Sequence, residues 1–139
     1  MNRDSYLLDS SALLTFIEDE DGSERVESVL REGGAFLPWL VLMEVHYISR
    51  QEKGITEAYR RYALMKQLPC EILWQVDERI LLTASRFKAS YQVSLADAVI
   101  AAFAHRRNAI LLHKDPEFEA LADQVRLEAL PYKTEAAPP

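Results

Sequence analysis

Short, almost wholly apolar runs alternate along this chain with longer stretches in which apolar residues recur at helical spacing. Apolar runs without polar alternation are typical of strands that helices cover on both faces, as in parallel sheets. The alternation therefore predicts an α/β fold, a three-layer α/β/α domain with a mainly parallel central sheet of about five strands. The strand candidates are 6–8, 35–37, 71–76, 109–113 and 126–130. The helix candidates are 11–17, 23–31, 40–51, 56–68, 78–91, 95–106 and 116–122.

The length of the chain indicates one domain. At 139 residues it can bury a real core, and we expect a single domain over 1–130 followed by a flexible tail over 131–139. No apolar stretch approaches the roughly 20 residues that a membrane helix needs. The segment MNRDSYLLD reaches an acid too soon for a secretory signal, and Cys70 is the only cysteine. We therefore expect a protein of the reducing cytoplasm, without a membrane association.

Three aspartates lie where an apolar pattern is interrupted. Asp9 stands within the apolar run YLLDSSALL, where burial of a carboxylate without a partner costs several kcal/mol. Asp97 follows Ser94 at the spacing of a capping box, and Asp115 precedes Pro116, a favourable first residue of a helix. Taken singly, each aspartate could be an ordinary helix N-cap.

Glu44 is harder to explain as a surface residue. In WLVLMEVHYI, its neighbours three and four residues away are Leu40, Val41, Tyr47 and Ile48, all apolar or aromatic. A glutamate that serves solubility belongs on the opposite face of an amphipathic helix. A tilted helix with a snorkelling carboxylate is the alternative interpretation.

The predicted topology brings the four acids to one edge of the sheet. Asp9 and Asp115 each end a strand, Asp97 lies in the first turn of its helix, and Glu44 lies about two turns into the helix after the second strand. Residues that follow parallel strands share the edge where ligands bind. Carboxylates crowded there repel one another unless protons or cations intervene, and an all-oxygen ligand set favours Mg²⁺ or Mn²⁺ over zinc. The sequence thus predicts a divalent-metal site.

Four segments in this order resemble those of PIN-domain ribonucleases, and more narrowly VapC-type toxins of toxin–antitoxin pairs. They are LLDSSALL, the helix with Glu44, SLADAVIAAFA and ILLHKDPEF, and together they span residues 5 to about 120. The resemblance implies a PIN-like fold and a metal-dependent endoribonuclease, a hydrolase of RNA phosphodiesters. It also implies the metal-binding and catalytic acids, which are Asp9, Glu44, Asp97 and Asp115, with Ser11 as a polar support.

Two positions depart from the pattern of the family. His113 stands two residues before the last acid, where members commonly carry Thr or Ser, and Glu117 stands two residues after it, where many carry Asp. We treat both as supporting residues, because neither change removes one of the four carboxylates. In the implied reaction, a divalent ion lowers the pKa of a bound water and orients it in line with the phosphodiester, while a second ion, if present, stabilises the leaving oxygen.

The resemblance also implies partners. A cognate antitoxin would lay an apolar segment near Trp39, Tyr59 and Tyr62 and bring a basic side chain to the acids, although these aromatic residues could equally be ordinary core or interface residues. A homodimer is also expected. The net charge of −6 opposes binding to a polyanion such as RNA, so metals and nearby cations must offset it, and Lys114 is the nearest candidate.

Two other functions fit parts of the pattern. A PIN scaffold without catalytic activity could act as an interaction module. A phosphatase with Asp9 as nucleophile typically needs a second aspartate two residues later, where this chain has Ser11. Neither the histidines nor the serines of the chain show the spacing of a zinc site or of a Ser-His-Asp relay.

Overall fold

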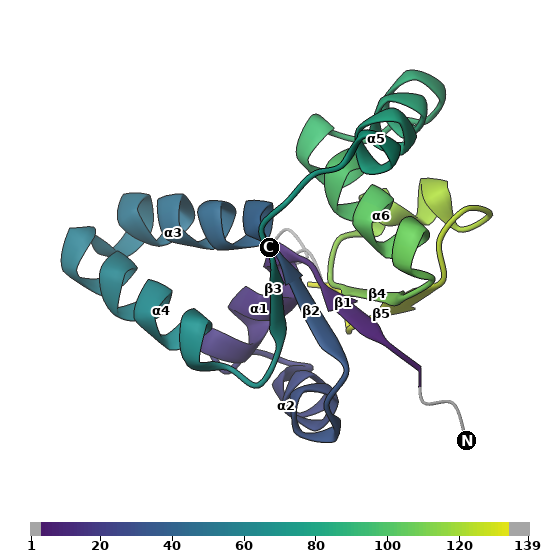
Figure 1. Ribbon diagram of the computed structural model, residues 1–139. Helices are drawn as coiled ribbons and strands as arrows, with labels where there is room; N and C mark the ends of the chain where they lie inside the picture. Colours follow the sequence, from purple (N-terminus) through teal and green to yellow (C-terminus); the bar gives the residue numbers. More distant parts are fainter. Residues whose placement is uncertain (1–3, 134–139) are drawn as a thin grey trace, which may run out of the picture.

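The computed structural model of the protein describes residues 4–133 (Figure 1). Five parallel strands form one sheet in the order β3-β2-β1-β4-β5. The strands are β1 (Tyr6–Leu8), β2 (Ala35–Pro38), β3 (Glu71–Leu73), β4 (Ile110–His113) and β5 (Leu127–Ala129). This confirms the predicted parallel sheet.

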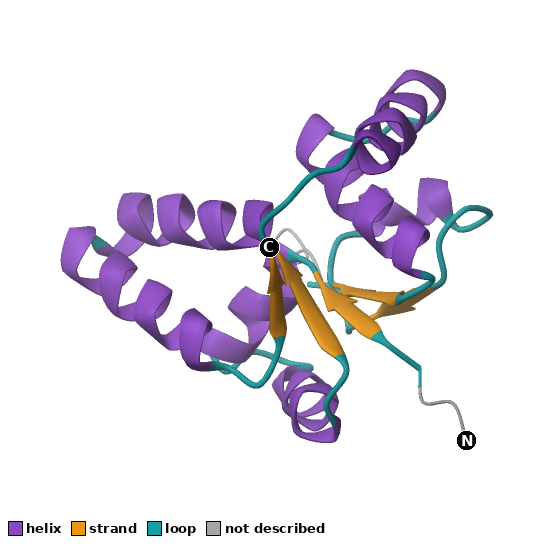
Figure 2. Ribbon diagram, in the orientation of Figure 1, coloured by secondary structure: helices purple, strands orange, loops and turns teal. Residues whose placement is uncertain are grey.

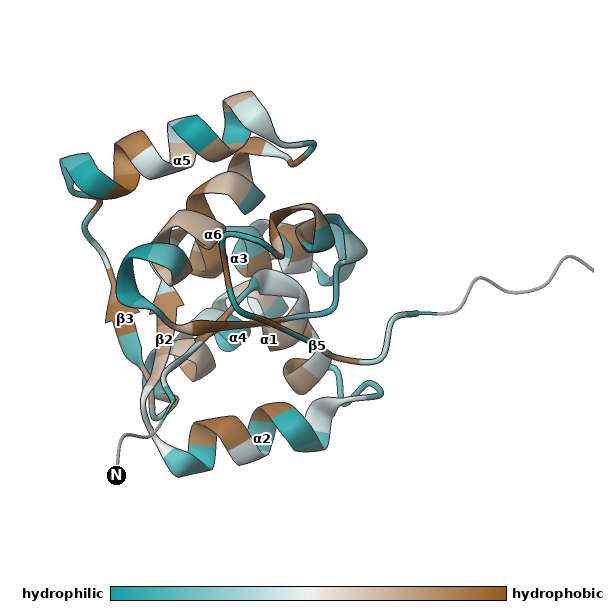
Figure 3. Cartoon of the chain, turned by 90° about the vertical axis from the view of Figure 1, so that its right-hand side faces the viewer, coloured by the Kyte–Doolittle hydropathy of each residue, from teal (hydrophilic) through white to brown (hydrophobic). Residues whose placement is uncertain are grey.

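Helices cover both faces of the sheet, as the apolar strands require. The helices are α1 (Ser10–Ile17), α2 (Ser23–Glu32), α3 (Trp39–Lys53), α4 (Ile55–Gln67), α5 (Glu78–Ser90) and α6 (Leu95–Arg107), with the 3₁₀ helix η1 (Pro116–Leu121). They pack as the pairs α1 with α2, α3 with α4, and α5 with α6 (Figure 2). Figure 3 shows α2 on one side of the sheet and α5 and α6 on the other.

The central strands are buried on both faces. Leu7 and Leu8 are consecutive in β1 and therefore point to opposite faces, yet both are fully buried, and so are Leu111 and Leu112 in β4. This double burial explains why the strand segments lack polar alternation. None of the helices in the described part of the chain has the length and apolarity that a membrane crossing requires.

Most element boundaries lie within one or two residues of the prediction, and β3, β5 and the segment 116–122 illustrate the differences. β3 ends at Leu73 rather than at residue 76, because its last partner is Pro38, where β2 gives way to α3. β5 covers only Leu127–Ala129 of the predicted 126–130. The predicted helix at 116–122 is the 3₁₀ helix η1, which ends at Leu121. The predicted flexible tail falls mainly on residues 134–139, which lie outside the described residues.

Candidate active site

Asp9 joins the end of β1 to the start of α1. Its Oδ1 accepts the Ala12 N–H at 2.8 Å, so it is the N-cap of α1, and Ser11 Oγ lies 2.8 and 2.7 Å from its two oxygens. The residue is only 3% exposed. The pKa of Asp9 is raised to about 7, first by burial and also by the charge of Asp115, against the opposing effect of the hydrogen bonds from Ala12 and Ser11. Asp9 is therefore a cap and also a strongly perturbed acid.

Ser11 connects the two strand ends that carry aspartates. Its Oγ accepts the backbone N–H of Lys114 at 2.8 Å, across 103 residues of sequence, while its hydroxyl proton is directed at Asp9. This single hydroxyl therefore holds the turn after β1 against the turn after β4. The geometry is what a polar support to the site requires.

His113 holds the turn that carries Asp115. Its Nδ1 accepts the Asp115 N–H at 3.2 Å, and Asp115 Oδ1 in turn accepts the Glu117 N–H at 3.0 Å. Burial lowers the pKa of His113, which favours the neutral ring with Nδ1 free to accept. A Ser or Thr hydroxyl makes the same contact with a backbone N–H two residues on, so the imidazole supplies an equivalent acceptor at this position.

Asp97 lies in the first turn of α6 with its carboxyl group largely buried. Its pKa is raised well above the ordinary value, first by burial and then by a hydrogen bond with the Glu117 side chain. The negative charges of Asp115, Glu117 and Asp9 raise it further. These acids therefore share one electrostatic environment at the carboxyl edge of the sheet.

Three acids form the most compact group within the described residues. One oxygen each from Asp97, Asp115 and Glu117 lies within 4.8 Å of the other two. The structure thus brings two of the four predicted ligands together with Glu117, which the sequence suggested only as a support. Asp9 is coupled to this group through its charge.

Glu44, in α3, is outside the group of three acids and is connected to the turn after β1. Its Oε1 accepts a hydrogen bond of 2.6 Å from Ser10 Oγ, and Ser10 directly follows Asp9. The half-buried carboxylate is therefore tied to the turn after β1, which distinguishes it from a freely snorkelling surface glutamate. Ser10 was not named with Ser11 among the predicted supporting residues. Its position next to Asp9, at the end of a buried strand, was the available signal.

The residues present fit a hard divalent cation. All candidate donors at the edge are oxygens, which Mg²⁺ and Mn²⁺ prefer. The pKa values of Asp9 and Asp97 are raised first by burial and then by the charges of neighbouring acids, and a bound cation would favour the ionised form of both groups.

Lys114 does not point its ammonium group into the acid group. Its Nζ donates to the carbonyl oxygen of Asp21 at 2.7 Å. The side chain instead lines a cavity of about 360 Å³ that Ser11 and Asp115 also line, together with Lys133 and several glutamates. The lysine that the sequence proposed for RNA binding therefore lies beside the acids, at the border of a polar cavity.

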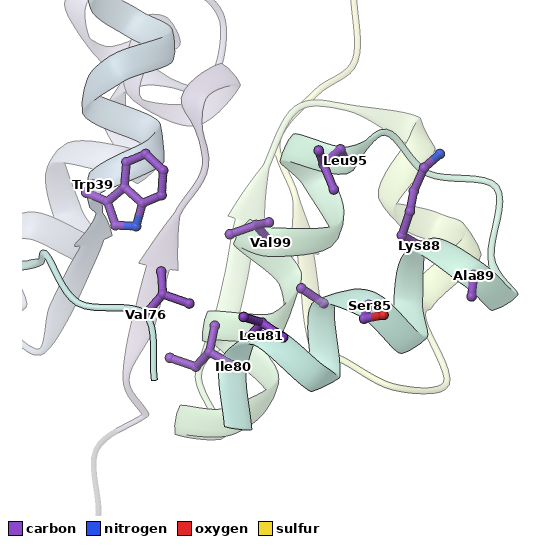
Figure 4. Close-up of a pocket in the computed structure, with 10 residues that line it drawn as sticks. Trp39, Val76, Ile80, Leu81, Ser85, Lys88, Ala89, Leu95 and Val99 are labelled. Atoms are coloured by element: carbon purple, nitrogen blue, oxygen red, sulfur yellow. The ribbon is translucent and has the colours of Figure 1, made fainter. Parts of the chain in front are cut away.

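A larger cavity of about 560 Å³ lies away from the acids, between the start of α3 and the pair α5 and α6 (Figure 4). Its walls are mostly apolar and include Trp39, Val76, Leu81, Leu95 and Val99. None of the candidate acids lines it. The larger hollow is thus an apolar surface feature, and the candidate site remains at the edge of the sheet.

Comparison with known proteins supports the fold. The chain resembles VapBC2 from Rickettsia felis, solved bound to a promoter DNA fragment, with a TM-score of 0.74 and 16% identity over 91% of this chain and 98% of that one. For DNA-bound VapBC from Salmonella typhimurium, the TM-score is 0.71 and the identity 18% over 91% of this chain and 98% of that one. For VapC20 from Mycobacterium tuberculosis, a toxin that cleaves the Sarcin-Ricin loop, the TM-score is 0.66 and the identity 14% over 84% of this chain and 94% of that one.

At these identities the similarity to solved structures concerns the fold. No curated protein sequence gives a significant match. The model of the PIN domain family, in contrast, matches residues 6–124 of the sequence, from the start of β1 to the turn before β5. The chain belongs to the PIN domain family.

Proposed function

We propose that this protein is a divalent-metal-dependent endoribonuclease that hydrolyses RNA phosphodiesters, and that it is the toxin of a toxin–antitoxin pair. The observation that carries the proposal is the gathering of buried or half-buried acids from separate elements at one edge of the sheet. Asp97, Asp115 and Glu117 converge within 4.8 Å, and Asp9 is buried beside them. Such charge crowding is costly for folding, and it is typical of a site that is completed by a cation.

Asp9, Glu44, Asp97 and Asp115 would hold the cation, which we propose to be Mg²⁺ or Mn²⁺. When bound, such an ion activates water and neutralises charge on a phosphodiester. The chain itself supplies the orientation. Hydroxyl groups from the first turn of α1 fix Asp9 and Glu44, and the neutral His113 ring fixes the turn of Asp115.

The toxin role is supported by the resemblance of the motifs and by the VapBC complexes that share the fold. An apolar surface on α3 and α4 suits the apolar segment of an antitoxin. Met43 on α3, Tyr59 on α4 and Trp74 directly after β3 are each about half exposed. Tyr62 lines a hollow of about 300 Å³ together with Trp39 and Trp74. A basic side chain of the antitoxin would then neutralise the acids.

A second apolar surface supports the proposed homodimer. Leu81, Leu82 and Leu95 on α5 and α6 are each more than half exposed, beside the apolar cavity of Figure 4. A second copy would remove these side chains from water. Light scattering at micromolar concentration tests this, and a monomer there would contradict the dimer.

RNA cleavage by purified protein tests the enzymatic proposal. We expect the parent to cut RNA with Mg²⁺ or Mn²⁺ and not with EDTA, and we expect Asp97→Asn to lower the rate at least about 100-fold, because it removes a charged ligand. Asp77→Asn is the matched control, since Asp77 caps α5 away from the acids. Mapped cleavage ends in total RNA after induced expression would identify the substrate. A folded parent that cuts no RNA under any of these conditions would instead favour a scaffold.

A further inference from the structure

The N-terminus of α6 contains half of a capping box. In a complete box, the hydroxyl of the N-cap residue accepts the N–H of the third helical residue, and the side chain of that third residue accepts the N–H of the N-cap. In α6 the N-cap is Ser94 and the third residue is Asp97. The first bond is present, because Ser94 Oγ accepts the Asp97 N–H at 3.1 Å.

The second bond is made by a residue from another element. The Ser94 N–H donates to Glu117 Oε1 at 2.8 Å, and Glu117 lies in η1, 23 residues further along the chain. Since this N–H is engaged by Glu117, the Asp97 carboxylate is not needed to close the box. Asp97 keeps the backbone position of a capping residue, while its carboxyl group hydrogen-bonds with the Glu117 side chain instead of with the Ser94 N–H.

The same glutamate also meets the other acid of the site. Its backbone N–H donates to Asp115 Oδ1 at 3.0 Å. Three hydrogen bonds therefore run in sequence from the Asp97 backbone through Ser94 and Glu117 to the Asp115 side chain. This path fixes the start of α6 against the turn after β4.

We propose that Glu117 is a positioning residue: it takes over the N-cap N–H of α6 and thereby lets the Asp97 carboxyl group lie beside Asp115 and Glu117, where a cation would bind. This inference rests on the proposed function for its cation, but the capping exchange itself does not. Without Glu117, the nearest carboxylate able to satisfy the Ser94 N–H is that of Asp97, drawn by the partial positive charge of the helix N-terminus. Closing the box in this way would turn Asp97 away from the site.

The length of the glutamate side chain matters for this role. Aspartate, which many family members carry at this position, is shorter by one carbon–carbon bond, a loss of about 1.5 Å of reach. With the backbone of η1 in place, that loss would separate the carboxylate from the Ser94 N–H. The glutamate at this position therefore reaches the helix cap while it also belongs to the group of three acids.

The substitution Glu117→Gln separates the capping role from direct cation binding. The amide oxygen of glutamine can accept the Ser94 N–H, but the side chain carries no charge. We would titrate the full-length protein with Mn²⁺ by calorimetry as the parent, Glu117→Gln and Glu117→Ala. We expect Glu117→Gln to bind within about threefold of the parent and Glu117→Ala to bind about tenfold more weakly. Equal weakening in both variants would show that the Glu117 charge binds the ion, and parental affinity in Glu117→Ala would show no positioning role. Either result overturns the inference.

Amide hydrogen exchange in EDTA tests the cap without any cation. We expect the Ser94 N–H to remain protected in Asp97→Ala, where Glu117 still accepts it, and to exchange at least about tenfold faster in Asp97→Ala/Glu117→Ala. Faster exchange in Asp97→Ala alone would show that Asp97 closes its own box and would overturn the proposal. A parent that binds no Mn²⁺ would overturn the proposed function and the cation part of this inference, while the exchange results would still decide the cap.

Discussion

Ser10 Oγ donates a hydrogen bond of 2.6 Å to Glu44 Oε1 and so joins residues 34 positions apart in the sequence. Ser10 is the first residue of α1, directly after Asp9, and Glu44 lies in the middle of α3. A hydroxyl that donates to a carboxylate fixes the rotamer of a side chain that would otherwise turn freely. The site therefore depends on neutral hydroxyl groups as well as on its acids.

Removal of the Ser10 hydroxyl should affect the affinity for a cation more than the stability of the fold. We expect Ser10→Ala to lower the free energy of unfolding by about 1 kcal/mol, because half-buried Glu44 can still be solvated, and to weaken Mn²⁺ binding several-fold. Thermal melts and calorimetric titration measure the two effects. Ser85→Ala, an exposed position in α5, is the control and should change neither quantity. Unchanged Mn²⁺ affinity in Ser10→Ala would remove Glu44 from the proposed ligands.

The buried acids predict an unusual pH dependence for the metal-free protein. The pKa of Asp9 is about 7 in the folded state against an ordinary value of 3.8, so between these values the folded state binds more protons than the unfolded state. Its contribution to stability is therefore present at acid pH and is lost as the pH rises through about 7, by up to about 4 kcal/mol. Unfolding in EDTA across this pH range should show the decline, and saturating Mg²⁺ should remove it.

Asp9→Asn should reduce this decline, because an amide keeps the cap and cannot ionise. The control is Asp77→Asn in α5, since the two aspartates cap their helices with the same bond of 2.8 Å, to Ala12 N and Ile80 N respectively. At pH 8 in EDTA we expect Asp9→Asn to exceed the parent by at least about 1 kcal/mol and Asp77→Asn to match it. Equal pH profiles for the parent and Asp9→Asn would show that Asp9 ionises normally in the folded protein.

The sequence allowed the sheet and the position of the acids to be predicted because both follow from local pattern. Leucine doublets in β1 and β4 indicate strands buried on both faces; Asp9 directly follows the first doublet, and Asp115 lies three residues after the second. The parallel topology then brings the two strand ends together. These steps need only strand order and direction.

Contacts between separate elements could not be predicted in this way. Glu117 accepts from Ser94 because η1 packs beside the start of α6, and no spacing in the sequence reports that neighbourhood. Likewise, the Lys114 ammonium group donates to the backbone carbonyl of Asp21, because the loop between α1 and α2 lies within its reach. The end of β3 depends on the neighbouring strand β2. Pairing stops at Pro38 and Leu73, although the predicted strand segment runs on to residue 76.

Two substitutions of His113, to leucine and to asparagine, should differ in their effect on Mn²⁺ binding. His113→Leu removes the acceptor for the Asp115 N–H, which costs about 1–3 kcal/mol for an unpaired buried group, whereas His113→Asn can keep an acceptor but leaves space beside Phe118. We expect urea unfolding to show both variants destabilised, and Mn²⁺ titration to show weakened binding only for His113→Leu. Equal Mn²⁺ affinities would mean that the imidazole does not position Asp115.

The imidazole also contributes a pH effect of opposite sign. Because burial lowers the pKa of His113 below 6.5, the unfolded state takes up a proton that the folded state resists. The contribution of His113 to stability is therefore present above about pH 6.5 and is lost as the pH falls. The difference between the His113→Asn and parent profiles in EDTA should show this loss, and parallel profiles would contradict it.

We expect Lys114 to contribute to RNA binding by this acidic protein. Its ammonium group is anchored on the Asp21 carbonyl at the border of the cavity that Ser11 and Asp115 also line, so a phosphate that approaches the acids from this cavity would meet it. Arg107 is different, because its guanidinium group lies over the Phe36 ring, 4.7 Å from the centroid, at the far end of α6 from Asp97. We expect Lys114→Ala to weaken RNA binding and Arg107→Ala to change mainly stability.

A salt series on RNA affinity in an Asp97→Asn background measures this directly. With few phosphate contacts, the logarithm of the binding constant should fall with the logarithm of the salt concentration with a slope of about two to four, and Lys114→Ala should reduce that slope by about one. Arg107→Ala should leave the slope unchanged while it lowers the melting temperature, because it loses the stacking contact with Phe36. A slope near ten, or one that Lys114→Ala does not alter, would place the RNA on a basic surface away from this cavity.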